Sequence, residues 1–195
     1  QENVDFNNIE LLIAVDASQV VAIAAVYLRL GQPKGKFKCQ LIAAKSKLTS
    51  KLTVPRAELK ACVMGVNLGD LVQKMFGGLV KKKLFITDST VALSWIHQDS
   101  RPLQVGVRNC VIQIRRYSEV DSWRHVESAL NPADIGTRPC EVKEVMQGSA
   151  WQVGYDWMTL QQQQMPMKTV QELTLSKEYQ VPVAKETRNS DIQAT

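Results

Sequence analysis

The chain of 195 residues fits one domain of ordinary size with an additional segment, because single cores usually form at roughly 100 to 200 residues. Its apolar fraction of 45%, with four residues each of Trp, Tyr and Phe, is enough to bury such a core and excludes a chain that is disordered throughout. The net charge of +5 and the isoelectric point near 9.0 permit a polyanionic partner without requiring one.

The first part of the chain predicts three strands joined by short turns. Two nearly continuous β-branched apolar runs, Ile9–Ser18 and Gln19–Leu30, are typical of strands that are covered on both faces. Lys36–Leu48 is a third, more polar strand, and the short joins, including Gly31–Gly35, indicate antiparallel hairpins. We therefore expect the first strand to lie at the centre of a sheet.

Two helices and a further strand follow. Apolar residues recur at three- and four-residue spacing in Thr53–Phe76, which predicts one long helix with Pro55 at its start. The short apolar run Leu84–Thr87 predicts a buried strand that leads into a helix at Asp88–His97. A strand–helix–strand unit implies parallel pairing by a right-handed crossover.

Shorter elements complete the predicted domain. Pro102–Tyr117 has the pattern of an amphipathic helix, and Ser122–Val126 has that of a last strand. Asn131 is a good N-cap for a further helix, in which Pro132 occupies the first turn.

The C-terminal part divides into an aromatic segment and a polar one. Trp151, Tyr155 and Trp157 fall at helical or near-helical spacing, and we expect them to cover the core rather than to bind a ligand. From Gln161 onward the composition shifts to Gln, Lys, Glu, Thr and Ser, which cannot bury enough surface to order itself. We therefore expect a domain over residues 1–160, with a Trp-rich C-terminal cap at 147–160, and a disordered or linker tail at 161–195.

Four acidic residues form a candidate site. Asp16 and Asp88 each follow an apolar strand segment, and parallel neighbouring strands would bring both to the edge where open α/β sheets bind ligands. Glu58 and Asp134 fall in the first turns of two predicted helices. Taken singly, Asp16 and Asp88 are better explained as turn or N-cap residues, and Glu58 and Asp134 are equally well explained as acids that complement a helix dipole. Together they predict a carboxylate cluster that needs cations, and purely oxygen ligands favour Mg²⁺ or Mn²⁺ over zinc.

Four short motifs carry a resemblance to a known family. They are Thr53–Leu59 (TVPRAEL), Thr87–Ser89 (TDS), Trp123–Val126 (WRHV) and Asn131–Asp134 (NPAD). With the order of the predicted elements, they resemble the ribonuclease H domain of BEL/Pao-type retrotransposon polyproteins, from about Ile9 to Leu160. The resemblance implies an α/β, ribonuclease H-like fold: a mixed five-stranded sheet, three antiparallel strands and then parallel additions, with helices on both faces.

The same resemblance implies an activity. It is an endonuclease that hydrolyses the RNA strand of RNA–DNA hybrids by two-metal-ion catalysis, as part of a retroelement pol polyprotein. The implied partners are the hybrid, recognised by its shape, phosphates and 2′-hydroxyls, and adjacent reverse transcriptase and integrase domains. Residue by residue, the resemblance implies that the catalytic residues and the ligands of two Mg²⁺ or Mn²⁺ ions are Asp16, Glu58, Asp88 and Asp134.

One family feature is not carried over. Cellular and retroviral members have a histidine in a flexible loop shortly before the last aspartate. Here His125 lies nine residues before Asp134 and belongs to the predicted last strand. No role in catalysis or product release is therefore assigned to His125.

A basic stretch lies between residues 31 and 60. It can follow the phosphates of a nucleic acid, but a solvated strand edge explains it equally well. Its cations and the hydroxyl residues beside the acids are the candidates for nucleic-acid binding: Ser18, Lys45, Lys47, Lys51, Arg56, Ser89 and Thr90.

Two other functions stay open at this point. The first is a catalytically silent ribonuclease H-like module, a connection-type spacer or a domesticated protein that binds nucleic acid or a partner; it predicts a lost carboxylate, and none is lost. The second is a different nuclease or a strand-transfer enzyme on the same fold, against which the contexts of Glu58 and Asp134 argue.

The cysteines and the distribution of apolar residues indicate the cellular compartment. The four cysteines are far apart and only two histidines are present, which argues against a structural zinc and predicts buried free thiols in a reducing compartment. No run approaches the roughly 20 apolar residues of a membrane span, and no signal peptide opens the chain. We expect an intracellular, cytoplasmic protein that contacts no membrane, and the initial Gln suggests a piece of a longer polypeptide.

Overall fold

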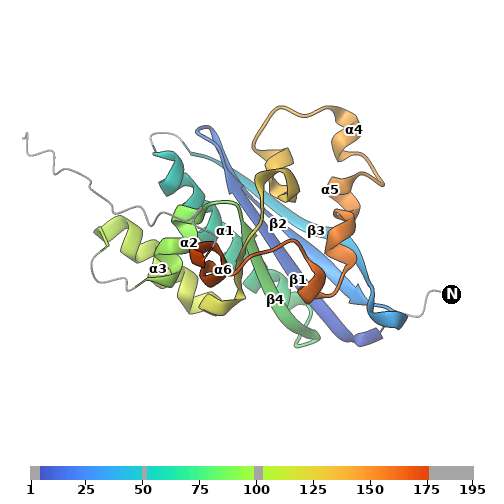
Figure 1. The fold of residues 1–195 in the computed structure, drawn as a ribbon. Helices are drawn as coiled ribbons and strands as arrows, with labels where there is room; N and C mark the ends of the chain where they lie inside the picture. Colours follow the sequence, from blue (N-terminus) through green and yellow to red (C-terminus); the bar gives the residue numbers. More distant parts are fainter. Residues whose placement is uncertain (1–4, 50–51, 99–102, 176–195) are drawn as a thin grey trace, which may run out of the picture.

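The centre of the molecule is a five-stranded sheet with the order β3-β2-β1-β4-β5, seen in a computed structural model that describes residues 5–49, 52–98 and 103–175 (Figure 1). β1 (Asp5–Ala17), β2 (Val21–Gly31) and β3 (Phe37–Leu48) are antiparallel neighbours. β4 (Val80–Thr87) and β5 (Trp123–His125) extend the sheet in parallel on the other side of β1. The mixed sheet and its central first strand, both predicted from the sequence, are confirmed.

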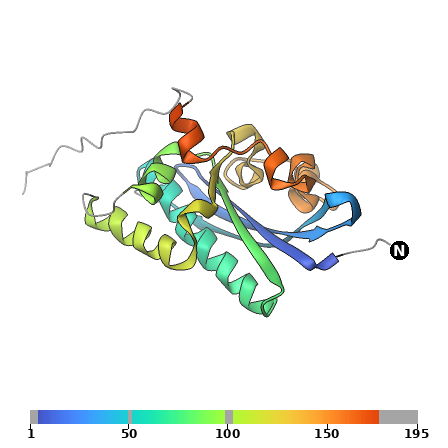
Figure 2. The same ribbon diagram turned by 60° about the horizontal axis from the view of Figure 1, so that its bottom comes forward.

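One face of the sheet is covered by three helices. They are α1 (Val54–Met75), α2 (Thr90–His97) and α3 (Val105–Tyr117), and all three lie on the same side in Figure 2. The apolar side chains that α1 and α3 turn toward β1, β2 and β4 form the larger core. The predicted helical periods in these segments are therefore confirmed, with ends that differ by a few residues.

Two glycines let α1 approach the sheet closely. A Cβ atom at Gly65 would lie 2.5 Å from Cγ1 of Val15, and one at Gly69 would lie 3.2 Å from Cγ1 of Ile13. Glycine inside a helix costs about 1 kcal/mol relative to alanine. The close packing that it permits offsets this cost and brings the N-terminal part of α1 to the end of β1.

The other face is covered by short helices from the C-terminal third. These are η4 (Pro132–Gly136), α4 (Val142–Val145), α5 (Ala150–Val153) and η5 (Asp156–Thr159). Between them and the sheet lies a second core, which contains Trp157 at 8% exposure and the partly buried aromatic rings of the same segment. Helices therefore cover both faces, as predicted.

The chain keeps packing on the domain beyond residue 160, where the sequence predicted a linker. Met165 and Leu173 are only 6% and 3% exposed, and Leu173 belongs to the larger core. Lys168 pairs with the edge of β5: its N–H donates to the His125 carbonyl at 2.9 Å, and the His125 N–H donates back at 2.8 Å. α6 (Val170–Leu175) follows. The predicted boundary is thus too early for 161–175, while 176–195 lie outside the described residues.

A buried arginine on β2 holds the start of this C-terminal segment. The Arg29 side chain is 1% exposed and forms an ion pair with Glu10, Nη1 to Oε2, at 2.9 Å. Its Nη2 donates to the Leu160 carbonyl at 2.6 Å, and its guanidinium lies 4.1 Å from the centre of the Phe37 ring. Arg29 therefore connects β1, β2 and the segment that leads to Met165.

Removal of residues 161–195 is expected to lower the free energy of unfolding by about 2–4 kcal/mol, because Met165 and Leu173 leave their cores. The reference is the chain that ends at Leu175, so that the difference reports on residues 161–175 alone. Urea denaturation of the two truncated chains measures it. Equal midpoints would show that this segment contributes nothing to stability.

The cysteines and the helices were also compared with the prediction from the sequence. Cys39, Cys62 and Cys110 are buried free thiols as predicted, but Cys140 is exposed because it lies in the loop after η4. Among the described residues, we find no helix whose length and apolar character would allow it to cross a membrane.

Candidate active site

The two strand-end aspartates lie beside each other. The parallel register pairs Ala14 of β1 with Ile86 of β4, and Asp16 and Asp88 each follow two residues later. The Asp16 side chain is nearly buried at 8% exposure. Burial raises the pKa of Asp16, and the negative charge of Asp88 raises it further. The adjacency predicted from the strand pattern is present.

Glu58 reaches the same edge from α1. The helix begins at Val54, so Glu58 lies in its second turn and not in the first as predicted. Ser89 Oγ donates a hydrogen bond to Glu58 Oε2 at 2.5 Å. Burial raises the pKa of Glu58 to about 7; the hydrogen bond opposes this shift, and the charges of Asp88 and Asp16 add to it.

Asp134 joins the cluster from the opposite side of the sheet. It lies in the first turn of η4, a 3₁₀ helix at the place where the sequence predicted a further helix. Asn131 caps η4 by accepting from the Ala133 N–H at 3.1 Å, and its own Nδ2 donates to the Val15 carbonyl at 3.0 Å. This fully buried amide ties η4 to β1 next to Asp16, whose pKa the charge of Asp134 raises.

Two further hydroxyl groups orient carboxylates of the site, and the sequence pattern predicted neither contact. Thr137 Oγ1 donates to Asp16 Oδ2 at 2.6 Å, and Ser128 Oγ donates to Asp88 Oδ2. The other oxygen of Asp88, Oδ1, is buried and has no hydrogen-bond partner among the described residues. The one sequence signal for Thr137 is its position three residues after Asp134, about one helical turn further on.

His125 lies beside the site but on a strand. Its Nε2 is 3.1 Å from the carbonyl oxygen of Asp88, and burial lowers its pKa. Because a carbonyl only accepts, the neutral ring donates from Nε2 to this oxygen. His125 therefore holds the backbone of Asp88, and its place in β5 agrees with the assignment from the sequence.

The four carboxylates do not converge on one point. Within residues 5–49, 52–98 and 103–175, no three side chains of Asp, Glu, His or Cys converge as the ligands of one metal ion. Hydroxyl donors instead occupy one oxygen each of Asp16, Asp88 and Glu58. Divalent ions would have to draw these side chains together.

The raised pKa of Glu58 predicts how metal-free stability depends on pH. Between about pH 4.5 and 7 the folded state keeps Glu58 protonated and the unfolded state does not, so the free energy of unfolding falls as the pH rises. Allowing for partial exposure of the side chain, we expect a loss of about 1–2 kcal/mol. The Glu58→Gln variant, denatured in EDTA at pH 4.5 and pH 8, should equal the wild type at the lower pH and exceed it at the higher. The same difference in stability between the two proteins at both pH values would contradict the raised pKa of Glu58.

Two lysines among the predicted nucleic-acid contacts lie at the site's end of the sheet. Lys47 pairs with Ala22 and Lys45 with Ala24 on β2, whose partners on β1 are Ala17 and Val15, next to Asp16. Both lysines are exposed. Because Ala22 and Ala24 belong to the core beneath α1, both lysines project on the face of the sheet that carries α1.

Other predicted contact residues are engaged within the protein. Ser18 accepts from the Val21 N–H at 3.2 Å in the turn between β1 and β2. Ser89 caps α2 as well as holding Glu58. Arg56 donates to Gln104 Oε1 at 2.5 Å, Thr90 begins α2, and Lys51 lies outside the described residues.

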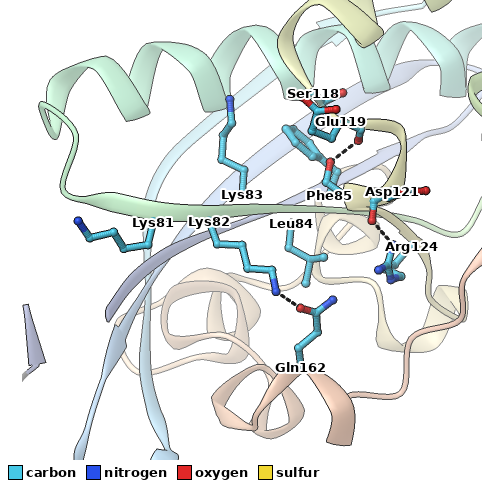
Figure 3. A pocket seen from close by; sticks show the side chains of 11 residues that line it. Lys81, Lys82, Lys83, Leu84, Phe85, Ser118, Glu119, Asp121, Arg124 and Gln162 are labelled. Atoms are coloured by element: carbon cyan, nitrogen blue, oxygen red, sulfur yellow. Dashed lines mark hydrogen bonds between the residues drawn. The ribbon is translucent and has the colours of Figure 1, made fainter. Parts of the chain in front are cut away.

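A basic cavity lies away from the carboxylates. It has a volume of about 410 Å³ and lies at the start of β4, the end of that strand opposite to Asp88 (Figure 3). Lys82 Nζ donates to the side chain of Gln162, and Arg124 Nη1 donates to the Asp121 carbonyl at 2.5 Å. Lys82 and Arg124 therefore contact the protein itself, and the cavity does not extend the carboxylate site.

The strand order, the antiparallel β1–β3 and the acids at the ends of β1 and β4 define a ribonuclease H-like domain. More particularly, residues 1–89 match the model of the Pao retrotransposon-like RNaseH-like domain. The resemblance inferred from the motifs is thereby confirmed for β1 to β4, which carry Asp16, Glu58 and Asp88. Asp134 lies beyond the matched residues.

Solved ribonuclease H structures are also similar to this chain. The N-terminal RNase H domain of a Mycobacterium tuberculosis protein, solved as a fusion with maltose-binding protein, is 11% identical with a TM-score of 0.44, over 67% of this chain and 91% of that one. RNase H1 of the halophilic archaeon Halobacterium salinarum is 17% identical with a TM-score of 0.36, over 63% and 87%. No curated protein matched the chain by sequence.

Proposed function

We propose that this ribonuclease H-like domain is an endonuclease that hydrolyses the RNA strand of RNA–DNA hybrids. It would act in the cytoplasm as part of a retroelement pol polyprotein, beside reverse transcriptase and integrase domains. The observation that carries the proposal is the pairing of β1 with β4, which sets Asp16 beside Asp88, with Glu58 and Asp134 close enough for their charges to couple to these aspartates. Like charges at short range destabilise a fold, so structure alone gives no reason to gather them.

The donor set fits Mg²⁺ or Mn²⁺. It consists of carboxylate oxygens, the ligands that these hard ions prefer, and Asp88 Oδ1 is a buried acceptor without a hydrogen-bond partner in the described chain. Bound there, two divalent ions would lower the pKa of an attacking water and neutralise the leaving 3′-oxygen. We propose that their ligands would be Asp16, Glu58, Asp88 and Asp134, because the charges of Asp88 and Asp134 both act on Asp16 and those of Asp16 and Asp88 act on Glu58.

The neighbouring residues would act as positioning residues. Thr137 and Ser128 orient one oxygen each of Asp16 and Asp88. Asn131 holds η4 on β1, and His125 holds the backbone that carries the Asp88 side chain. Together they limit the movement of the acids before substrate arrives, which reduces the reorganisation that the reaction requires.

A comparison of three duplexes tests the proposal. Labelled RNA–DNA hybrid, RNA duplex and DNA duplex are incubated separately with the chain and Mg²⁺ or Mn²⁺. We expect cleavage of the RNA strand in the hybrid alone, and none in EDTA. Hybrid binding without cleavage would favour the catalytically silent module, and cleavage of duplex DNA would favour a different nuclease on the same fold.

For substrate binding, we propose that Lys45 and Lys47 contact phosphates of the hybrid, together with Ser18, Lys51, Arg56, Ser89 and Thr90. The two lysines are exposed on the face of the sheet that carries α1, and their strand is two strands from that of Asp16, roughly 10 Å at the usual strand spacing. That distance is within reach of a duplex that lies across the carboxylates.

Replacing both lysines by Gln is expected to weaken hybrid binding and to flatten its salt dependence. Each lost phosphate contact should reduce the slope of log affinity against log salt by roughly 0.7 to 0.9. Binding is measured at several salt concentrations in an inactive Asp16→Asn background. The control is the Lys81→Gln, Lys82→Gln pair, which removes the same charge at the start of β4. Equal slopes of log affinity against log salt for the Asp16→Asn background and both double-lysine variants would favour a solvated strand edge.

A further inference from the structure

Asp134 differs from the other site carboxylates in the charge of its partner. Arg138 Nε lies 2.9 Å from Asp134 Oδ2, four residues along the chain. Asp16, Glu58 and Asp88 accept from neutral hydroxyls instead. Within the described chain, Asp134 is thus the one member of the cluster held by a cation.

A second carboxylate holds the same guanidinium. Arg138 Nη2 is 2.9 Å from Glu144 Oε1 in α4, and Glu144 Oε2 accepts from the Glu141 N–H at 2.8 Å. Glu144 is therefore fixed at the start of α4 independently of Asp134. If Arg138 loses its contact with Asp134, the contact with Glu144 can still hold the side chain close to the site.

The ion pair lies where a divalent cation would need the carboxylate. Arg138 occupies Oδ2 of Asp134 and places a positive charge beside any ion bound between Asp134 and Asp16. The charges of Asp88 and Asp16 both raise the pKa of Glu58, and the hydrogen-bond partners of Glu58 and Asp88 are uncharged serines. The two halves of the cluster therefore present different electrostatic environments to a cation.

We propose that Arg138 is a built-in counter-ion that competes with the divalent ion bound between Asp16 and Asp134. This inference rests on the proposed function. The ion held by Asp16, Glu58 and Asp88 binds first, and the ion at Asp134 binds more weakly because it must displace the guanidinium toward Glu144. Occupancy of the second position, and with it readiness for catalysis, is then set by Arg138.

Titration with Mn²⁺ in the absence of nucleic acid tests this role, with calorimetry and the electron paramagnetic resonance of free Mn²⁺ as readouts. We expect two classes of site in the wild-type chain. In Arg138→Gln the weaker class should tighten by about two- to five-fold, the range that follows from loss of a partly exposed ion pair, and the tighter class should not change.

Two matched variants separate competition from general electrostatics. Lys143→Gln removes a positive charge nearby, but Lys143 pairs with Glu141 at 2.7 Å and not with Asp134. Glu144→Gln removes the outer partner and leaves Arg138 on Asp134. Neither variant should raise the Mn²⁺ affinity of the weaker site. Circular dichroism and thermal unfolding verify that each variant is folded.

Three results of the Mn²⁺ titration would contradict the proposals. Equal tightening in Arg138→Gln and Lys143→Gln, or weaker binding in Arg138→Gln, would overturn the competition. If the wild-type chain binds Mn²⁺ and cleaves the hybrid while Arg138→Gln gives the same isotherm, the role of Arg138 alone is overturned. If the wild-type chain binds no Mn²⁺, the proposed function falls together with it.

Discussion

Asp88→Asn is expected to reduce hybrid cleavage by about 10³-fold or more, which corresponds to roughly 4 kcal/mol of transition-state stabilisation. Asparagine keeps the size of the side chain and can still accept from Ser128, but it removes the negative charge that a divalent ion requires. Asp88 Oδ1 is buried and has no hydrogen-bond partner among the described residues, so it can bind a metal ion without giving up a hydrogen bond. Single-turnover cleavage in saturating Mg²⁺ measures the loss.

The control for this variant is Asp156→Asn, which changes an exposed acid in η5 on the covering segment. It should retain wild-type cleavage. The free energy of unfolding of Asp88→Asn should equal or exceed that of the wild type, because one of several clustered negative charges is removed. Full Mg²⁺-dependent activity in Asp88→Asn would refute the assignment of Asp88.

Arg29→Ala is expected to lower the free energy of unfolding by about 3–5 kcal/mol, the range for breaking a buried ion pair by removal of one partner. The variant leaves the Glu10 carboxylate, whose side chain is only 17% exposed, without its counter-ion. It also removes the donor to the Leu160 carbonyl and so loosens the segment that carries Met165. Urea denaturation at neutral pH measures the change.

The double variant Glu10→Gln with Arg29→Met is the matched control for the buried charge. Replacing both partners leaves no uncompensated ion, so the double variant should lose less stability than Arg29→Ala alone. Both proteins should cleave the hybrid normally where they are folded, since Glu10 and Arg29 lie toward the end of β1 opposite to Asp16. A loss of less than about 1 kcal/mol in Arg29→Ala would show that the ion pair is not a main anchor of the C-terminal segment.

Local pattern was sufficient for the strands and the three long helices. β1 and β2 are continuous β-branched apolar runs, and α1 has an unbroken helical period, so their own residues specify their type. The same strands place Asp16 and Asp88 at their carboxyl ends, and the parallel pairing inferred from the crossover brings the two together. The motifs around Glu58 and Asp134 added their resemblance to a family, and residues 1–89 match it.

The polar contacts were decided by tertiary structure. Thr137 donates to an aspartate 121 positions away, and Asn131 to a carbonyl 116 positions away, so no local spacing could predict either contact. The burial of Arg29 depends on Glu10, Phe37 and Leu160, which come together only after the sheet forms.

By itself, the sequence determined the order and type of the main elements, the sheet edge where Asp16 and Asp88 meet, and the presence of aromatic residues that cover the second face. Only the tertiary structure decided that residues 161–175 belong to the packed domain. Met165 and Leu173 are widely spaced in a polar segment, and their burial depends on surfaces that distant strands and helices create. A repeating apolar spacing in the sequence reflects one buried face of a regular helix or strand. A single apolar side chain that packs into an existing core has no such repeat, so the sequence pattern cannot predict its burial.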